Sequence, residues 1–383
     1  DTQKFLYNSN NNLSKLLKSD GTFVEFVYGL EDKDGNLYTT STINEEGFAE
    51  KFDYDRANKI TTYTDHDGVV TVYKYDENHL VTEQKEADGT SVKFAYNDTG
   101  KVIAQTVNGS TTRFAYDEKD NLLKVQYADN SSESFTYNNE NRCIKVTDRD
   151  GIVTEFSYDK NGNCTSVLRG GIEAVRAAYN AKGLVTDIYR NGGEVLSRTS
   201  FSYDTKGNVI EKITYTKKAV IKESWTYDEQ NRVVLYIDGE KQKFTYSYTD
   251  KTVTEKTAAG LERTYTTNSR KDLILIEETD TLTGEKRLFA YEYDKRHLVT
   301  AVKAGASEKE LATVVSYEYS KAGKALSEKR TDDNGSWITE YVYDSAGRIE
   351  AVKRSKTDQY GKSNKQPVTQ KYSYARTSSG SEF

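Results

Sequence analysis

The feature that most constrains this chain is a repeat of about 21 residues, marked by the dipeptide Tyr-Asp or Tyr-Asn. Between Tyr54 and Tyr179 the copies are 21, 21, 20, 21, 21 and 21 residues apart, and the spacing later widens to 24 or more. A fixed period of this length indicates a repeat architecture in which each unit packs on its neighbours. The clear repeat anchors are Tyr54, Tyr75, Tyr96, Tyr116, Tyr137, Tyr158, Tyr179, Tyr203, Tyr227, Tyr293 and Tyr343. With Tyr7 and weaker copies at five further positions there are seventeen anchors, hence about sixteen units; the weaker copies are Tyr28, Tyr246, Thr267, Tyr319 and Tyr374.

The residue types around each anchor predict a β-hairpin. An aromatic side chain usually stands two residues before the tyrosine, which places both rings on one face of a strand. Asp or Asn follows the tyrosine and favours the first position of a type I turn. Four residues after the tyrosine comes Gly, Asn, Asp or His, including Asn58, His79 and His297, and these types tolerate positive φ. The turn residues predicted in this way are Asp55, Asp76, Gly100, Asp117, Asp159, Gly162, Gly183, Asp204, Gly207, Asp294, Asp344 and Gly347.

A second turn completes each unit. Asp-Gly or Asn-Gly places a glycine seven residues before an anchor in six units, and these dipeptides are strong hairpin signals. They are Asp20-Gly21, Asp67-Gly68, Asp88-Gly89, Asn108-Gly109, Asp150-Gly151 and Asp238-Gly239. The chain is therefore predicted to be all-β, a continuous ribbon of consecutive antiparallel hairpins.

We expect one repeat array over residues 1–376, with a regular core at 52–167 and irregular units at 168–200 and 250–292. Residues 377–383 have the composition of a flexible tail or an expression remainder. The composition fits a single uncovered sheet, since 35% of residues are hydrophobic whereas globular domains have about 45–50%. In such a sheet the thirty tyrosines would stack across strands while their hydroxyls stay hydrated or hydrogen-bonded.

The motif aromatic-x-Tyr-Asp-x-x-Gly resembles the YD repeats of the RHS-repeat family. Phe156-Ser157-Tyr158-Asp159-Lys160-Asn161-Gly162 and Phe201-Ser202-Tyr203-Asp204-Thr205-Lys206-Gly207 are close copies. That family includes bacterial wall-associated proteins, polymorphic toxins, components of insecticidal toxin complexes and the teneurins. The resemblance implies a curved or spiral strip that forms part of a shell. The family's Asp-Pro-rich cleavage segment is missing, because the only proline is Pro367, so neither toxin nor autoproteolysis is carried over.

The resemblance implies a non-enzymatic scaffold of a secreted or cell-surface bacterial protein, as a section of a toxin-encapsulating β-shell. Its partners would be other YD repeats of the parent protein. An alternative is an extracellular adhesin, a ribbon that recognises a glycan or a host protein through exposed aromatic side chains. The sequence leaves both functions open.

Residues that could carry chemistry have simpler structural explanations. Cys143 and Cys164 occupy the same apolar column of adjacent units, about 9–10 Å apart, which is too far for a disulfide, so we expect buried small side chains. His79 and His297 fall in the turn column. Three Asp-x-Asp-Gly segments, beginning at Asp32, Asp65 and Asp148, lack the remaining ligands of a calcium loop. We therefore predict no catalytic residue, metal or cofactor.

Charge and hydropathy limit the partners. A net charge of −6 argues against nucleic acid, and the longest apolar run, Leu273–Ile276, is far below the ~20 residues of a membrane span. Residues 348–376 hold eight Lys or Arg against Glu350 and Asp358. This basic segment is either a solvated face or a contact for an anionic polymer.

Overall fold

The computed structural model describes residues 3–33, 35–191, 196–358 and 367–374. They form one sheet of 33 strands in which every strand pairs antiparallel with the next strand along the chain. The helical content of these ranges is one 3-10 turn, η1 (Glu308–Glu310), and none of their helices is long and apolar enough to cross a membrane. The predicted all-β ribbon of antiparallel hairpins is confirmed.

The strands are short, with four to nine residues each. They are β1 (Lys4–Tyr7), β2 (Leu13–Leu17), β3 (Phe23–Glu31), β4 (Leu37–Asn44), β5 (Ala49–Asp55), β6 (Ile60–Thr64), β7 (Val70–Tyr75), β8 (Val81–Lys85), β9 (Ser91–Tyr96), β10 (Val102–Val107), β11 (Ser110–Tyr116), β12 (Leu122–Gln126), β13 (Ser132–Tyr137), β14 (Cys143–Thr147), β15 (Val153–Tyr158), β16 (Cys164–Arg169), β17 (Ile172–Tyr179), β18 (Val185–Asn191), β19 (Leu196–Tyr203), β20 (Val209–Tyr215), β21 (Val220–Tyr227), β22 (Val233–Ile237), β23 (Lys243–Tyr248), β24 (Thr252–Thr257), β25 (Leu261–Thr267), β26 (Leu273–Asp280), β27 (Lys286–Tyr293), β28 (Val299–Gly305), β29 (Ala312–Tyr319), β30 (Ala325–Asp332), β31 (Gly335–Tyr343), β32 (Ile349–Thr357) and β33 (Val368–Lys371).

The turn after each anchor is stabilised by the side chain that follows the tyrosine. In the β7–β8 hairpin, Asp76 Oδ1 accepts hydrogen bonds from the amides of Asn78 and Leu80, both at 2.9 Å. The third loop residue, His79, has φ 63°. A type I turn followed by a left-handed residue is a common three-residue hairpin loop, and its extra residue produces a β-bulge beside the turn.

The anchor tyrosine is held at that bulge by its hydroxyl. In the β15–β16 hairpin the register shifts between Ser157 and Tyr158, and the Tyr158 hydroxyl donates to the carbonyl of Cys143 in the preceding hairpin at 2.7 Å. The same bond recurs along the sheet, as in Tyr28 to Leu13, Tyr96 to Val81, Tyr203 to Val185, Tyr293 to Leu273 and Tyr374 to Ile349. Each tyrosine that makes this bond connects its own unit to the unit before it.

The unit anchored by Tyr54 departs from the expected turn. Its loop contains four residues, Arg56 to Lys59, and the positive φ of 56° falls on Lys59, so the prediction for Asn58 was wrong. Tyr54 pairs with Thr61 without a register shift. The extra loop residue replaces the bulge, and this unit lacks the geometry of its neighbours.

The anchor near residue 246 was also misplaced. The hydroxyl that reaches the preceding hairpin belongs to Tyr248, which donates to Val233 O at 2.7 Å, and Thr249 takes the place of the turn aspartate. The predicted Asp238-Gly239 turn shifts with it, because Lys241 rather than Gly239 has positive φ, at 65°. Lys241 lies seven residues before Tyr248, the spacing seen in the regular units.

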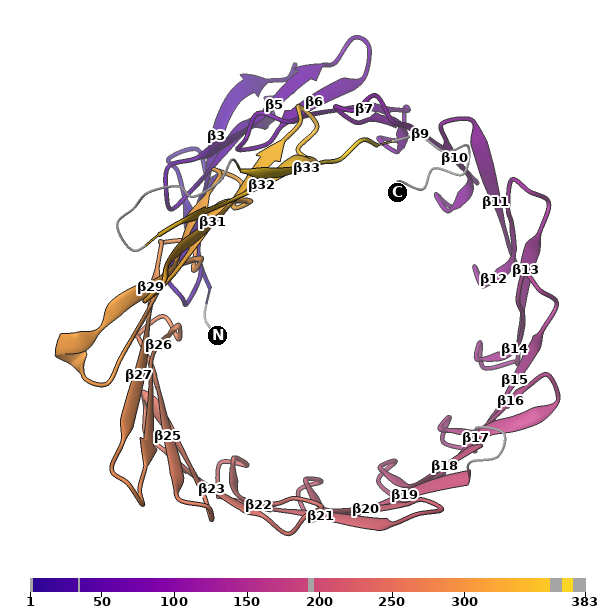
Figure 1. The fold of residues 1–383 in the computed structure, drawn as a ribbon. Coiled ribbons are helices and arrows are strands. Elements are labelled where there is room, and N and C mark those ends of the chain that lie inside the picture. The colour runs from indigo at the N-terminus through magenta and orange to yellow at the C-terminus, as the bar shows by residue number, and fades with distance from the viewer. Residues whose placement is uncertain (1–2, 34, 192–195, 359–366, 375–383) are drawn as a thin grey trace.

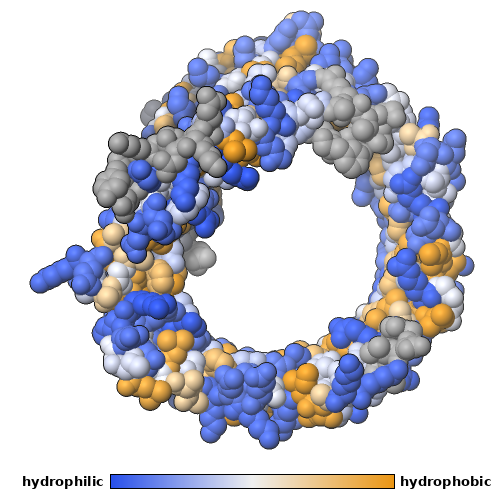
Figure 2. All heavy atoms as spheres, in the orientation of Figure 1, coloured by the Kyte–Doolittle hydropathy of each residue, from blue (hydrophilic) through white to orange (hydrophobic). Residues whose placement is uncertain are grey.

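The strip bends into a ring with an open centre, and β31 to β33 return to the region of β3 to β7 (Figure 1). In the space-filling view the centre stays open, and hydrophilic and hydrophobic residues are interspersed around the rim (Figure 2). The domain boundaries proposed from the sequence stay a prediction, and residues 377–383 lie outside the described ranges.

The sheet has almost no enclosed interior. The buried apolar residues are Val125, Leu288, Ala301, Ala351 and Val352, and four of the five lie in β27–β32. Elsewhere the aromatic face stacks on itself, as where Tyr236 lies 5.3 Å from Trp225 and 5.7 Å from Phe244, between ring centroids. Cross-strand ring contacts of this kind contribute about 0.5–1.5 kcal/mol each.

We predict that Tyr158→Phe lowers the free energy of unfolding by about 1 kcal/mol, because it removes a hydrogen bond to a bulge carbonyl. Tyr75→Phe is the matched control, since the Tyr75 hydroxyl makes no such bond within the described part of the chain and its ring stacks on His79. Urea unfolding of both variants provides the measurement. Equal losses for the two would contradict the role given to the anchor hydroxyl.

Candidate functional site

The predicted turn residues lie along one edge of the strip. We call the row of turns that follow the anchor tyrosines the YD edge, and the opposite row the return edge; Asp76–Leu80 and Asp65–Val69 are respective examples. Asp55, Asp76, Asp117, Asp159, Asp204, Asp294 and Asp344 each accept hydrogen bonds from amides of their own turn. Gly100, Gly162, Gly183, Gly207 and Gly347 have positive φ. These residues are spaced one turn apart, so the structure does not gather them into a catalytic cluster.

The two edges meet where the strip completes a turn, and we call this contact the seam. Turns of the return edge between β2 and β9 face turns of the YD edge between β25 and β32. Asp67 accepts hydrogen bonds from the Ala322 amide at 2.9 Å and from the Ser320 hydroxyl at 2.8 Å. Lys324 Nζ lies 3.5 Å from Asp67 Oδ2. The contact joins residues more than 250 positions apart in sequence.

The seam repeats in register from unit to unit. Glu46 Oε1 accepts from the Lys295 amide at 2.8 Å, and Asp88 Oδ2 lies 2.8 Å from Arg348 Nη1. A cation–π contact accompanies these bonds, since the Arg296 guanidinium lies 5.3 Å from the Phe48 ring centroid. In four successive turns of the return edge, the seam carboxylate belongs to the residue directly before a glycine with positive φ. These residues are Asp20, Glu46, Asp67 and Asp88.

One winding of the strip comprises 23 strands. The β4–β5 turn faces the β27–β28 turn, β6–β7 faces β29–β30, and β8–β9 faces β31–β32. Successive strands run in opposite directions, so successive turns lie on alternate edges of the strip. A turn of one edge can therefore face a turn of the other edge only when a winding contains an odd number of strands. The strip is therefore a spiral whose second winding lies beside the first, not a closed ring.

Two of the seam carboxylates, Asp67 and Asp20, have lowered pKa values. Burial raises the pKa of Asp67, but the hydrogen bonds from Ala322 and Ser320 and the charge of Lys324 outweigh it, so the pKa lies below its ordinary value. The pKa of Asp20 is lowered by hydrogen bonds from the Thr22 hydroxyl and amide. Such carboxylates stabilise the seam only while they are ionised.

A histidine joins three units at the start of the seam. His297 lies in a left-handed turn position, with φ 65°. Its Nδ1 contacts Asp272 in the preceding YD turn, and its Nε2 lies 3.7 Å from Asp20 of the first winding. This is a structural position in the seam, as the turn column indicated, and it holds no nucleophile.

The two cysteines are free thiols, and each is half-buried, so the expectation that they are buried was wrong. A single sheet without a covering layer leaves the apolar column partly accessible. Among the described residues, no group of three His, Cys, Asp or Glu is placed to hold a metal ion. Of the basic C-terminal segment, Arg348 belongs to the seam.

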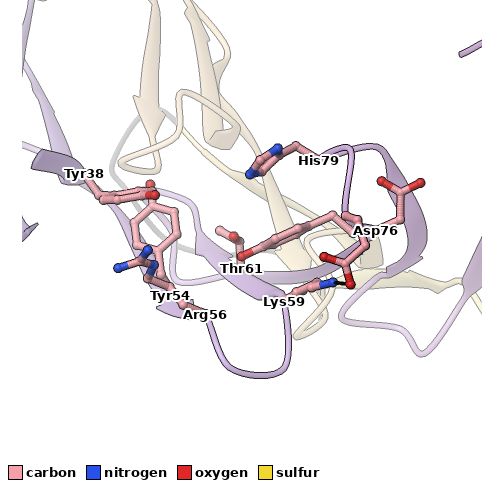
Figure 3. A pocket seen from close by; sticks show the side chains of 9 residues that line it. Tyr38, Tyr54, Arg56, Lys59, Thr61, Asp76 and His79 are labelled. Atoms are coloured by element: carbon pink, nitrogen blue, oxygen red, sulfur yellow. Dashed lines mark ion pairs between the residues drawn. The ribbon is translucent and has the colours of Figure 1, made fainter. Parts of the chain in front are cut away.

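Open cavities lie between successive turns of the YD edge in the first winding. The cavity of the Tyr54 unit, about 460 Å³, is lined by three tyrosines, two basic residues and a histidine among others (Figure 3). It lies outside both stretches that the sequence marked as irregular. Sequence analysis missed the seam and this cavity. A carboxylate before glycine in four turns was a signal for the seam, whereas the Tyr54 turn has the same length in sequence as its neighbours and gave no signal.

We predict that Asp67→Ala weakens the seam by about 1.5–3 kcal/mol, the usual contribution of hydrogen bonds to a charged group. The ring should then open, which raises the radius of gyration measured by small-angle X-ray scattering. Asp150→Ala is the matched control, because Asp150 also precedes a glycine of the return edge, Gly151, but lies outside the seam. Equal scattering from both variants would contradict the seam's role.

Acid should weaken the same contact. A carboxylate with a lowered pKa contributes stability that is complete above its ordinary pKa, near 4, and is lost as the pH falls through the lowered value. The urea midpoint is therefore expected to fall between pH 6 and pH 3, and to fall less steeply in Asp67→Ala. A midpoint that rises or stays constant over this range would contradict the assignment.

Comparison with known proteins agrees with this architecture. The family model described as the teneurin YD-shell matches residues 31–169, a little over a third of the chain. No curated protein matches the sequence.

Solved structures match over almost the whole length. The crystal structure of TcdB2-TccC3 aligns with a TM-score of 0.61 and 12% identity, covering 99% of this chain and 24% of that chain. The crystal structure of TcdB2-TccC3-Cdc42 aligns with a TM-score of 0.62 and 12% identity. A mutant of the Photorhabdus luminescens Tc holotoxin pore aligns with a TM-score of 0.61 and 12% identity. Each alignment covers 97% of this chain and 24% of that chain. This chain thus spans about a quarter of the length of these proteins, and at this identity the likeness shows the fold. The resemblance to YD-repeat (RHS-repeat) proteins is thereby confirmed, by the YD-shell match over residues 31–169 and by the fold over nearly the whole chain.

Proposed function

We propose that the chain is a non-enzymatic section of a β-shell of toxin-encapsulating type, from a secreted or cell-surface bacterial protein. The observation that carries the proposal is the seam, where the strip builds a wall two windings high from its own turns. A wall that grows by laying one winding beside another is suited to enclosing a volume. The shared fold with one quarter of much longer chains supports the same role.

The uncovered part of the YD edge supports the presence of a neighbouring segment beyond this chain. Within the described residues, the YD-edge turns between β9 and β24 have no second winding against them, and cavities of about 340 to 460 Å³ lie between these turns. At the seam the corresponding space is filled, since Val69 of the first winding approaches Gly347. We infer that a further winding of the parent protein, with carboxylates before its left-handed turn residues, covers this edge.

The sheet supports a scaffold rather than an enzyme because its polar residues are committed to holding turns. The Asp of each YD turn accepts amides of that turn, and the seam carboxylates bind across windings. Catalysis requires a nucleophile or a proton-transfer group beside a positioned partner. A second candidate function, recognition of a glycan or host protein as an adhesin, is favoured by the tyrosine-lined cavity of the Tyr54 unit.

Lysine footprinting of the isolated chain and of the longer parent protein tests the shell role. Lys119 and Lys160 are exposed on the free YD edge, so a covering winding should lower their acetylation several-fold in the parent. Lys324, which is half-buried at the seam beside Asp67, should be similarly protected in both proteins. Unchanged reactivity of Lys119 and Lys160 in the parent would overturn the proposal.

A further inference from the structure

The cavity of the Tyr54 unit differs from the others on the YD edge in its lining. Its volume of about 460 Å³ lies within the range of small-molecule sites. Tyr38, Tyr54, Tyr75 and His79 supply rings, and Arg56, Lys59 and Thr61 supply polar groups (Figure 3). A repeat protein that acquires a function in one unit should differ there from its own consensus.

The extra loop residue explains why one tyrosine hydroxyl in the cavity is free. In the regular units each anchor hydroxyl donates to a bulge carbonyl of the preceding hairpin. The β5–β6 hairpin has no register shift at Tyr54, because the Arg56–Lys59 loop absorbs the additional residue. The next anchor, Tyr75, therefore finds no such carbonyl, and its hydroxyl stays available to a ligand.

The rings in the cavity are arranged in two pairs. Tyr38 and Tyr54 lie 5.3 Å apart between centroids at an interplanar angle of 60°, and Tyr75 stacks on His79 at 6.2 Å and 19°. Tyr54 is fixed by its hydrogen bond to Thr39 O at 2.7 Å. Within the described chain, the hydroxyls of Tyr38 and Tyr75 have no hydrogen-bond partner. Aromatic faces beside unused hydroxyls suit a ligand with apolar C–H faces and a polar rim.

Of the described basic side chains that line the cavity, Arg56 is the one available to bind a ligand. Lys59 is paired with Glu77, and Asp76 accepts two amides of its own turn. The Arg56 guanidinium lies 5.2 Å from the Tyr38 centroid and has no carboxylate partner among the residues described. A guanidinium in this position can bind a carboxylate through two parallel hydrogen bonds.

The regular cavity between the Tyr137 and Tyr158 turns provides the comparison. Its lining has two aromatic residues, Phe156 and Tyr158, and the Tyr158 hydroxyl is already bonded to Cys143 O. The shared edge geometry therefore produces an inter-turn hollow, and the extra residue of the Tyr54 unit adds rings and free hydroxyls to it.

We propose that the Tyr54 cavity binds an acidic saccharide. A pyranose ring lies against the tyrosine faces, its carboxylate pairs with Arg56, and its hydroxyls bond to Tyr38, Tyr75 and Thr61. This site is open on the YD edge of the chain described here, and a further winding over that edge would cover it. The inference therefore rests on the lining of the cavity and not on the shell role.

Isothermal titration with tetragalacturonate tests the site, with cellotetraose as the neutral control. We expect saturable binding of the acidic sugar and at least tenfold weaker binding of the neutral one. Arg56→Gln should remove this preference, and Tyr75→Phe should weaken binding several-fold without lowering the urea midpoint. Arg142→Gln, in the regular cavity, should bind as the unchanged protein does.

Two results would overturn the site. The first is no saturable binding of tetragalacturonate by a chain whose scattering shows an intact ring. The second is binding that Arg56→Gln and Tyr75→Phe leave unchanged. Either result leaves the footprinting test of the shell unaffected, so the two proposals can fail separately.

Discussion

The structure depends on the hydrogen bond from the anchor tyrosine of a regular unit to a carbonyl of the hairpin before it. The turn requires a left-handed residue, that residue produces a bulge, and the bulge leaves a carbonyl that the tyrosine hydroxyl binds. Burial raises the pKa of Tyr158, so this hydroxyl remains a donor at neutral pH. A sheet with so few buried side chains can remain ordered because the regular units are bonded to their neighbours in the same way.

The seam and the Tyr54 cavity arise from small departures from that regularity. In four successive turns the carboxylate before glycine contacts the second winding. Two of these carboxylates, Asp20 and Asp88, also accept hydrogen bonds within their own turns. One additional loop residue removes a bulge and frees the hydroxyl of the next tyrosine. Both features use positions in the turns, where the repeat tolerates changes in residue type and length.

The fold could be predicted from the sequence because the tyrosine, the turn aspartate and the left-handed residue all act over short distances. The misplacement of the anchor at Tyr246 shows where this reasoning stops: Thr249 can cap a turn as Asp does, and only the hydroxyl bond identifies Tyr248. The seam could not be predicted, since the number of strands in a winding follows from the accumulated twist and bend of the sheet. The Tyr54 cavity needed the register of one hairpin, which a one-residue change in loop length alters.

The unlike edges of the strip have a consequence for assembly. At the seam, a row of acidic turns contacts a row of turns that present amides and cations, so the interface is heterologous. Such an interface has no two-fold axis and cannot be completed by pairing two identical surfaces. Each added layer presents the same unsatisfied row that the previous layer presented. The height of such a barrel is therefore limited by how many repeats are translated, or by a dissimilar cap at each rim, and not by symmetry.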